Sequence, residues 1–312
     1  MVSTTTIAVI IFVAAYALII TEKVHRTIVG IVGAMLMILF GVLDQETAIR
    51  HIDFNTLGLL MGMMIIVNIT SETGLFNFLA IWSAKKVKAR PIALLVALSA
   101  LTMACSAFLD NVTTVLLTVP ITFSITAQLK VDVKPYLISQ ILASNIGGTA
   151  TLIGDPPNIM IGSAVKELTF VAFIENLTPV VILCMAAVLF VMDVLYRKQM
   201  VTKPELQAEI MQMDEKKSLK DRKLLARSLF VLGLTILGFF THSFTHIESS
   251  VVALFGAFLL LLLAGGSQHD VDFSMRKVEW ATIFFFIGLF VAVGGLSETG
   301  VIRDLATGAV AL

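Results

Sequence analysis

Residues 144–158 read SNIGGTATLIGDPPN, a polar run rich in glycine and proline between long apolar segments. Glycine permits backbone conformations that other residues resist, and Pro156-Pro157 favours the start of a helix over its interior. The run therefore predicts that one half-helix ends here and another begins. Inside a membrane, backbone groups without partners are costly, so such irregular backbone survives only where it lines a cavity. We interpret the run as a break in a membrane helix and as the first candidate binding site.

The composition predicts an all-α polytopic membrane protein. The chain has 312 residues, of which 57% are hydrophobic and 14% charged, and its mean hydropathy is +0.94. Soluble domains are about one quarter charged. Several apolar runs reach the roughly 17 to 25 residues that span a bilayer. The formal net charge is zero and the basic residues gather in short loops, so the expected partner is the lipid bilayer and not a nucleic acid.

Loop charges predict the orientation in the membrane. Loops rich in Lys and Arg stay cytoplasmic, and three stand out, at residues 23–26, 85–90 and 196–227. The acidic loop 44–53 then lies outside, together with the N-terminus, and residues 1–20 form an uncleaved first transmembrane helix. The expected location is the cytoplasmic membrane. We expect the basic linker 196–227 to follow the anionic membrane surface.

The chain contains an internal repeat. A shift of 226 residues aligns Ser71-Glu72-Thr73-Gly74 with Ser297-Glu298-Thr299-Gly300. The same shift matches the identical pairs Glu22 and Glu248, Gly30 and Gly256, Asp44 and Asp270, Arg50 and Arg276, Thr56 and Thr282, and Gly62 and Gly288. Identity this spread out indicates a duplication, and the loop charges give the two copies opposite topology, as in inverted-repeat transporters. Glu72 and Glu298 are expected to hold the linker that follows each helix.

The repeat also predicts the segment boundaries. The first copy covers residues 21–195, with a helical hairpin at 91–130, the broken helix at 135–165 and a further helix at 170–195. Residues 196–227 link the copies, and residues 228–312 begin the second. The equivalents of Asp110 and Asn158 would fall beyond Leu312, so the second copy is truncated. We expect a fragment of a protein of about 420 residues rather than a function carried by half a site.

A second polar cluster, Asp110-Asn111-Val112-Thr113-Thr114, joins the two apolar arms of the hairpin. If this tip stops near the membrane midplane, Asp110 and Asn111 present oxygens to a cation, and Thr113 and Thr114 add hydroxyls beside a helix N-terminus. If the tip reaches the outer surface, Asp110 is an ordinary N-cap. The residues leave both readings open.

The broken helix offers ligands for either sign of charge. Asn145 and Asn158 flank a gap whose free carbonyls can bind a cation and whose free N–H groups can bind an anion or an uncharged oxyacid. Asp155 either carries a coupling proton in a low-dielectric site or caps the helix that follows. The alternative for the whole run is a surface loop between two short helices. The remaining candidate site residues in the run are Gly147, Gly148, Thr149 and Gly154.

One histidine pair has the spacing of a metal site. His242 and His246 are one helical turn apart and could bind Zn²⁺ with Glu248, but polar residues are ordinary at the end of a span. We therefore predict no metal centre and no cofactor, apart from a coupling ion, H⁺ or Na⁺.

On the tip motif, on the Gly-Asp-Pro-Pro-Asn run and on Thr21-Glu22-Lys23-Val24-His25-Arg26, the chain resembles the ion transporter superfamily. The likeness is to its ArsB/NhaD and melanosomal P-protein branch, with a citrate transporter-like domain, and covers almost the whole chain. It implies a scaffold domain and a transport domain with a re-entrant hairpin and a broken helix, in a homodimer that moves its substrate by an elevator-like shift. It also implies that the candidate residues of the tip and the break face the substrate and the coupling ion.

These features predict a secondary transporter and not an enzyme. Dicarboxylate members of the superfamily have Ser-Asn-Thr at the hairpin tip, whereas here Asp110 precedes Asn111 and adds a negative charge. A small inorganic ion is therefore favoured, either by arsenite or antimonite efflux or by Na⁺/H⁺ antiport. The alternatives are a di- or tricarboxylate (citrate-like) symporter and a passive anion channel. An intramembrane aspartyl protease is a remote alternative, because Asp110 and Asp155 lack its Gly-x-Gly-Asp and Tyr-Asp contexts.

Overall fold

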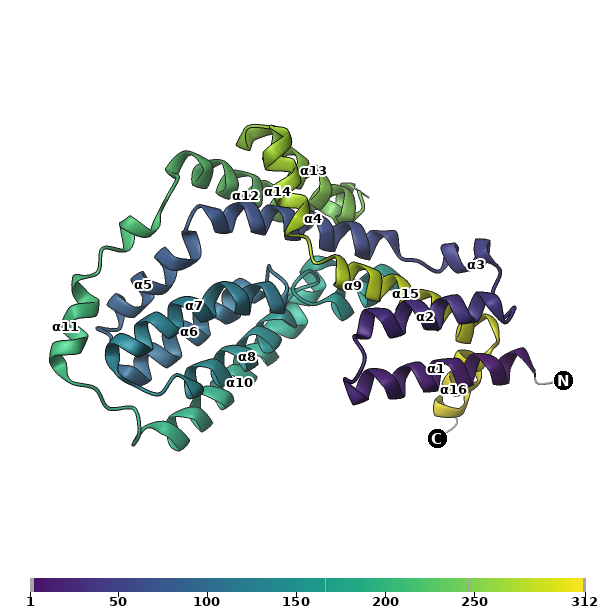
Figure 1. Cartoon of the computed structure of the whole chain (residues 1–312), viewed down its shortest axis with the longest axis horizontal. Helices are drawn as coiled ribbons and strands as arrows, with labels where there is room; N and C mark the ends of the chain where they lie inside the picture. Colours follow the sequence, from purple (N-terminus) through teal and green to yellow (C-terminus); the bar gives the residue numbers. More distant parts are fainter. Residues whose placement is uncertain (1–2, 166, 246, 311–312) are drawn as a thin grey trace. The chain divides into compact units, whose positions relative to one another are not determined.

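The computed structural model describes residues 3–165, 167–245 and 247–310, without the side chains of residues 242–244, 269, 309 and 310 (Figure 1). The described chain is helical and contains no strand. Six of its helices, α1, α4, α7, α10, α12 and α15, are long and apolar enough to cross a membrane. The prediction of an all-α polytopic membrane protein is confirmed.

The helices in chain order are α1 (Thr4–Thr21), α2 (Arg26–Leu39), α3 (Gln45–Arg50), α4 (Phe54–Glu72), α5 (Leu75–Lys86), α6 (Pro91–Ser106), α7 (Asn111–Leu129), α8 (Lys134–Gly148), α9 (Pro156–Ala164), α10 (Phe170–Tyr196), α11 (Pro204–Gln212), the 3-10 helix η1 (Glu215–Ser218), α12 (Arg222–Thr245), α13 (Ser249–Ala264), α14 (Gln268–Arg276), α15 (Trp280–Glu298) and α16 (Val301–Val310).

The chain divides into two compact units. The terminal unit comprises Met1–Leu57 and Glu279–Leu312, and the central unit comprises Gly58–Val278. Each unit therefore draws helices from both copies of the predicted repeat.

Equivalent positions of the two copies adopt the same local structure. With the shift of 226 residues, α4 falls on α15 at both ends, and the start of α5 falls on the start of α16. The two helix starts also share one side-chain hydrogen bond. Thr56 Oγ1 donates to Asp53 Oδ2 at 2.5 Å before α4, and Thr282 Oγ1 donates to Glu279 Oε2 at 3.1 Å before α15. The opposite membrane topology of the copies stays a prediction.

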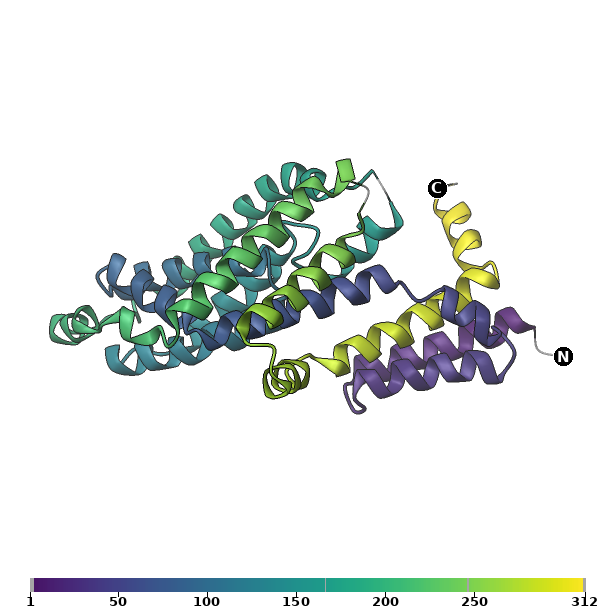
Figure 2. The ribbon, with the colours of Figure 1, turned by 90° about the horizontal axis from the view of Figure 1, so that it is seen from above.

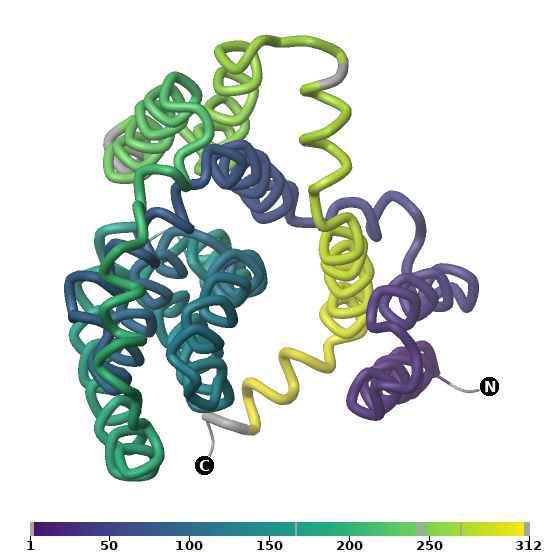
Figure 3. The backbone as a smooth tube through the Cα atoms, turned by 60° about the vertical axis from the view of Figure 1, so that its left-hand side comes forward, coloured from purple at the N-terminus to yellow at the C-terminus, as the bar shows by residue number. Residues whose placement is uncertain are grey.

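The same close helix crossing occurs once in each unit. In the terminal unit α2 packs against α15 (Figure 3), and a Cβ added to Gly288 would lie 2.4 Å from the carbonyl carbon of Gly30. In the central unit α4 meets α13, and a Cβ added to Gly62 would lie 2.6 Å from the carbonyl carbon of Ala253. Figure 2 shows α12 and α13 beside α4. Small residues let membrane helices approach this closely. The same helix crossing is therefore made twice. In the terminal unit the first copy supplies α2 and the second α15, whereas in the central unit the first copy supplies α4 and the second α13.

Alanine at either crossing is expected to destabilise the protein. Gly288→Ala and Gly62→Ala place a methyl group into the backbone of the neighbouring helix, and such overpacking costs about 1–3 kcal/mol. Thermal unfolding of the purified protein in detergent measures the loss. Gly233→Ala is the matched control, because a Cβ at this position of α12 has nothing within 4 Å. Equal midpoints for all three variants would contradict the close crossing.

The central unit contains a bundle in which α6, α7, α8 and α10 lie side by side (Figure 1). The base of the hairpin is filled by an apolar cluster that includes Leu98, Ile125 and Leu129. Tyr136 is buried in this cluster and donates its hydroxyl to the Pro91 carbonyl at 2.9 Å. The bundle thereby joins the two hairpin arms to α8, which leads into the broken helix.

The linker between the copies packs on protein. Helix α11 contacts α5 and α7, and its Ile210 is fully buried in the cluster at the hairpin base. Lys85 Nζ donates to Glu215 Oε2 at 2.6 Å, and this bond holds the pKa of Glu215 below its ordinary value. Lys220 N donates to the Thr73 carbonyl at 3.0 Å. The apolar face of α11 thus meets the hairpin, and the expectation that residues 196–227 follow the membrane surface stays a prediction.

Candidate functional site

The hairpin tip is ordered by three polar contacts. Asp110 is the N-cap of α7, and its Oδ1 accepts a bond from Thr113 N at 2.9 Å. Asn111 begins the helix, and Ser106 Oγ lies 2.8 Å from Asn111 Oδ1 and 2.7 Å from the carbonyl oxygen of Ser144. Asp110 therefore caps α7, its role as an ion ligand stays a prediction, and Ser106 ties the tip to α8.

The break between α8 and α9 spans residues 149–155 and is held by side chains. Asn158 Nδ2 donates to the carbonyls of Thr151 at 2.8 Å and Thr149 at 3.2 Å. Thr151 Oγ1 bonds to the carbonyl of Ala107 in the tip and accepts from Gly154 N at 3.2 Å. Asn158 therefore braces the break from inside α9, while Thr151 fastens it to the hairpin.

The tip and the break meet at their amides. Asn111 Nδ2 lies 3.4 Å from Asn145 Oδ1, and a Cβ added to Gly148 would lie 2.3 Å from Asn111 Oδ1. A Cβ added to Gly154 would lie 2.5 Å from the Gly148 carbonyl oxygen and 2.6 Å from that of Ser106. These glycines are required for space. The expectation that they supply unusual backbone geometry is wrong, because Gly147, Gly148 and Gly154 are not among the residues with positive φ.

The two acidic residues have different roles. Asp155 occupies the N-cap position of α9, yet its side chain makes no capping bond. Its carboxyl group instead lies close enough to the Asn111 side chain and to the charge of Asp110 to interact with both. Asp155 therefore does not cap α9 through its side chain, and its carboxylate lies beside the tip.

The remaining candidates lie around this contact or inside the hairpin. Thr149 Oγ1 donates back to the Asn145 carbonyl at 3.0 Å. Gly147 packs against α6, where a Cβ would lie 2.3 Å from the carbonyl oxygen of Met103. Thr113 and Thr114 are buried, and Thr114 Oγ1 has no partner among the described residues. The residues brought together are Asp110, Asn111, Asn145, Gly148, Gly154 and Asp155.

A buried polar bridge behind the tip escaped the sequence analysis. Gln140 Oε1 accepts from Thr122 Oγ1 at 3.0 Å, and its Nε2 donates to Thr102 Oγ1 at 3.3 Å. All three side chains are fully buried, so this glutamine of α8 joins both hairpin arms. The available signal was the four-residue spacing of Thr114, Thr118, Thr122 and Thr126, which places the threonines on one helix face.

Removing the bridge is expected to loosen the hairpin. Gln140→Leu keeps the volume but deletes two buried hydrogen bonds, each worth about 0.5–1.5 kcal/mol, so unfolding in detergent should become easier by about 1–3 kcal/mol. Thr126→Val is the matched control, because the Thr126 hydroxyl bonds only to carbonyls of its own helix. A Gln140→Leu variant as stable as this control would show that the bridge does not join the arms.

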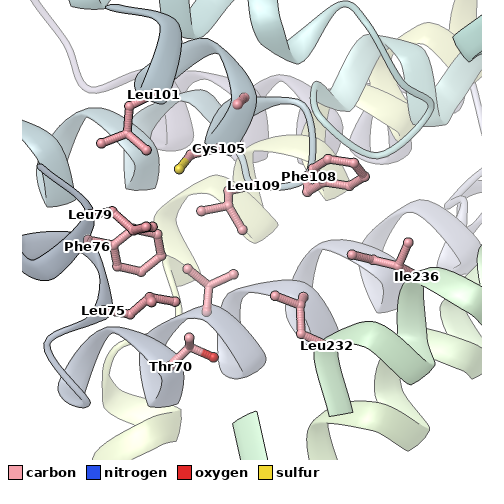
Figure 4. A pocket seen from close by; sticks show the side chains of 12 residues that line it. Thr70, Leu75, Phe76, Leu79, Leu101, Cys105, Phe108, Leu109, Leu232 and Ile236 are labelled. Carbon is pink, nitrogen blue, oxygen red and sulfur yellow. The ribbon is translucent and has the colours of Figure 1, made fainter. Parts of the chain in front are cut away.

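An apolar cavity lies near the tip but lacks the chemistry of an ion site. It has a volume of about 280 Å³ and is lined by α4, α5, the end of α6 and α12 (Figure 4). Its walls include Phe76, Cys105 and Leu109, and the Thr70 hydroxyl in the wall is bonded to the Ile66 carbonyl at 2.7 Å. The polar contact between tip and break is therefore the candidate site.

The metal alternative gains no support. In the part of the chain that the structure describes, no three His, Cys, Asp or Glu side chains are grouped so that they could hold a metal ion. The zinc alternative depends on His242 and His246, whose side chains lie outside the described residues.

Comparison with known proteins gives the family. A family model described as "Citrate transporter" (CitMHS) matches residues 16–312. An uncharacterized transporter of Mycobacterium tuberculosis is 40% identical over 98% of this chain and 71% of its own length. The 46 kDa membrane protein of Mycobacterium leprae is 36% identical over 96% of this chain and 70% of its own length. The human P protein is 32% identical over 96% of this chain and 44% of its own length, in agreement with the predicted P-protein branch.

The model match covers nearly the whole chain, and two of the relatives are named as transporter or membrane protein. The predictions of a multi-pass membrane transporter and of a protein that is not an enzyme are confirmed at this level. This chain belongs to the citrate transporter family.

Proposed function

We propose that the protein is a secondary active transporter of a small inorganic solute, in which Asp155 and Asp110 handle the coupling ion. The observation that carries the proposal is the Asp155 carboxyl group, which caps no helix and instead interacts with Asn111 and with the charge of Asp110. Two carboxylates that interact in a membrane site repel each other unless a proton or a cation lies between them. H⁺ or Na⁺ is therefore the expected coupling ion.

The acidic character of the site also guides the choice of solute. A site with two carboxylates suits a cation or an uncharged acid better than a polyanion. Na⁺/H⁺ antiport and the efflux of arsenite or antimonite are the two forms of the proposal. The side chains that would contact the solute are the amides of Asn111 and Asn145.

A citrate-like symporter is the second candidate, and a specific observation favours it. Helices α7 and α9 both begin at the site, at Asn111 and Pro156. Helix N-termini attract carboxylates, and the matching family model is described as a citrate transporter. A bound cation that neutralises Asp110 and Asp155 would make the site suitable for such an anion.

The membrane arrangement completes the proposal. The hairpin α6–α7 re-enters from the cytoplasmic side, and the N-terminus lies outside in the cytoplasmic membrane, as the loop charges require. The protein works as a homodimer, and an elevator-like shift of the hairpin and the broken helix carries the solute. Fusion of a reporter enzyme to the N-terminus and to the loop at residues 85–90 tests the orientation.

Flux measurements distinguish the candidates. The full-length protein is placed in proteoliposomes, and proton movement is recorded under Na⁺, Li⁺, arsenite or citrate gradients. Saturable proton flux with Na⁺ or arsenite supports the proposal, and flux with citrate alone supports the symporter. Currents that neither saturate nor couple to protons would indicate a passive channel and overturn both. Protein-free vesicles and the Gly233→Ala variant serve as controls.

A further inference from the structure

The glutamates of the two Ser-Glu-Thr-Gly turns form the same kind of pair in both units. In the central unit Lys277 Nζ bonds to Glu72 Oε1. In the terminal unit His51 Nε2 lies 3.1 Å from Glu298 Oε1. The shift of 226 residues carries His51 onto Lys277 and Glu72 onto Glu298. The expectation that these glutamates hold the following linker is therefore corrected, because each binds a residue of the other copy.

The His51 ring is fixed between two helices. His51 is the C-cap of α3, and a Cβ added to Gly294 of α15 would lie 2.6 Å from His51 Cγ. Its side chain is 28% exposed. The residue equivalent to Gly294 in the central unit is Asn68, whose Nδ2 donates to the Lys277 carbonyl at 3.1 Å. Both pairs are thus braced by the helix that carries the glutamate.

The other charged groups around the His51 pair have partners or positions of their own. Glu46 and Arg50 of α3 pair with each other. Asp44 and Asp53 cap α3 and α4. The further titratable groups on or beside the packed helices are Glu279 at the start of α15, Arg303 and Asp304 on α16, Tyr16 on α1, Glu22, Lys23 and His25 in the loop after it, and Arg26 on α2. Arg26 lies over the Phe285 ring near the start of α15, whereas His51 meets the end of that helix. Glu298 is the carboxylate that bonds to the ring.

We propose that His51 and Glu298 form a proton-dependent latch, for which the Lys277–Glu72 pair is the permanent counterpart. Lysine keeps its charge at neutral pH, whereas imidazole changes charge between about pH 5 and pH 8. At low pH the imidazolium pairs with Glu298 and ties α3 to the end of α15. As pH rises the ring loses its charge and the attraction is lost. With the proposed orientation, this latch senses the pH outside the membrane.

Two double-mutant cycles test the latch in the full-length protein. The first combines His51→Gln with Glu298→Gln, and the second, as the matched control, combines Lys277→Gln with Glu72→Gln. Unfolding midpoints in detergent are measured at about pH 5.5 and about pH 8.5. We expect non-additivity of about 1–3 °C in the first cycle at the lower pH only, and in the second at both. Coupling in the first cycle that is absent at the lower pH, or equal at the two pH values, would overturn the proposal.

Exchanging the basic residues of the two pairs tests more directly whether the charge of residue 51 sets the pH dependence. His51→Lys should keep the terminal pair coupled at the higher pH, and Lys277→His should make the central pair lose its coupling there. If neither exchange moves the pH dependence, the latch does not depend on the charge of residue 51. The readout is unfolding and not flux, so this outcome would leave the proposed transport function untouched.

Discussion

Gly154→Ala is expected to lower the initial transport rate by at least about 100-fold, the effect of a misplacement of about 1 Å at a site that must be held in register. The added methyl carbon would lie 2.5 Å from the Gly148 carbonyl oxygen and 2.6 Å from that of Ser106. Both neighbours are backbone atoms, which cannot move aside as a flexible side chain can. The break must therefore separate from the hairpin tip, and the contact of Asp155 with Asn111 is lost with it. Initial uptake into proteoliposomes measures the effect.

The control for this variant is Gly233→Ala, which adds the same methyl group where nothing lies within 4 Å. Gel filtration and the amount of protein recovered in vesicles show whether each variant is folded and inserted. A correctly inserted Gly154→Ala protein with the wild-type rate would mean that the break does not pack against the tip.

Asp155→Asn is expected to abolish coupled transport while leaving the protein folded. Because the Asp155 side chain makes no capping bond, its replacement by an amide should change the free energy of unfolding little. The coupling carboxylate, however, is gone, and proton flux driven by the solute gradient should fall to the level of protein-free vesicles. Flux and thermal unfolding are measured on the same preparation.

The neighbouring acid provides the comparison. Asp110→Asn retains a good N-cap, so its stability should match wild type, whereas Asp110→Ala should lose about 1 kcal/mol. Removal of one charge beside Asp155 weakens the site without deleting the coupling group, so Asp110→Asn should keep part of the flux. Full proton-coupled flux in Asp155→Asn would remove this residue from the coupling role.

The fold class was predictable because membrane-spanning helices are recognised from the hydropathy of consecutive residues. No information on which helices pack together is needed for this. The repeat was also visible, since identical residues recur at one shift. The pairing of α2 with α15 was not, because identity between two copies does not reveal which helix packs against which. The partners of Glu72 and Glu298 were missed for the same reason.

The site was less accessible to sequence reasoning. Polar and Gly-Pro content marked the tip and the break, but the Asn111–Asn145 contact joins residues 34 positions apart and depends on the packing of α6 against α8. The sequence analysis explained the glycines of the break by their conformational freedom. In the structure they are needed because a side chain at these positions would collide with neighbouring atoms. The packing of α11 on the hairpin was not predictable, because an apolar face of α11 looks the same in sequence whether lipid or protein covers it.

The packing of α2 from the first copy against α15 from the second has a consequence for biosynthesis. Gly30 of α2 packs against Gly288 of α15, which leaves the ribosome roughly 250 residues later, or more than about ten seconds at 5–20 residues per second. During that interval the surface of α2 around Gly30 lacks α15 and remains open to lipid or to an insertion chaperone. The crossing of α2 with α15 therefore forms only after α15 has been made, and in chains stalled before α15 a cross-linker at residue 30 should react with lipid or with an insertion chaperone.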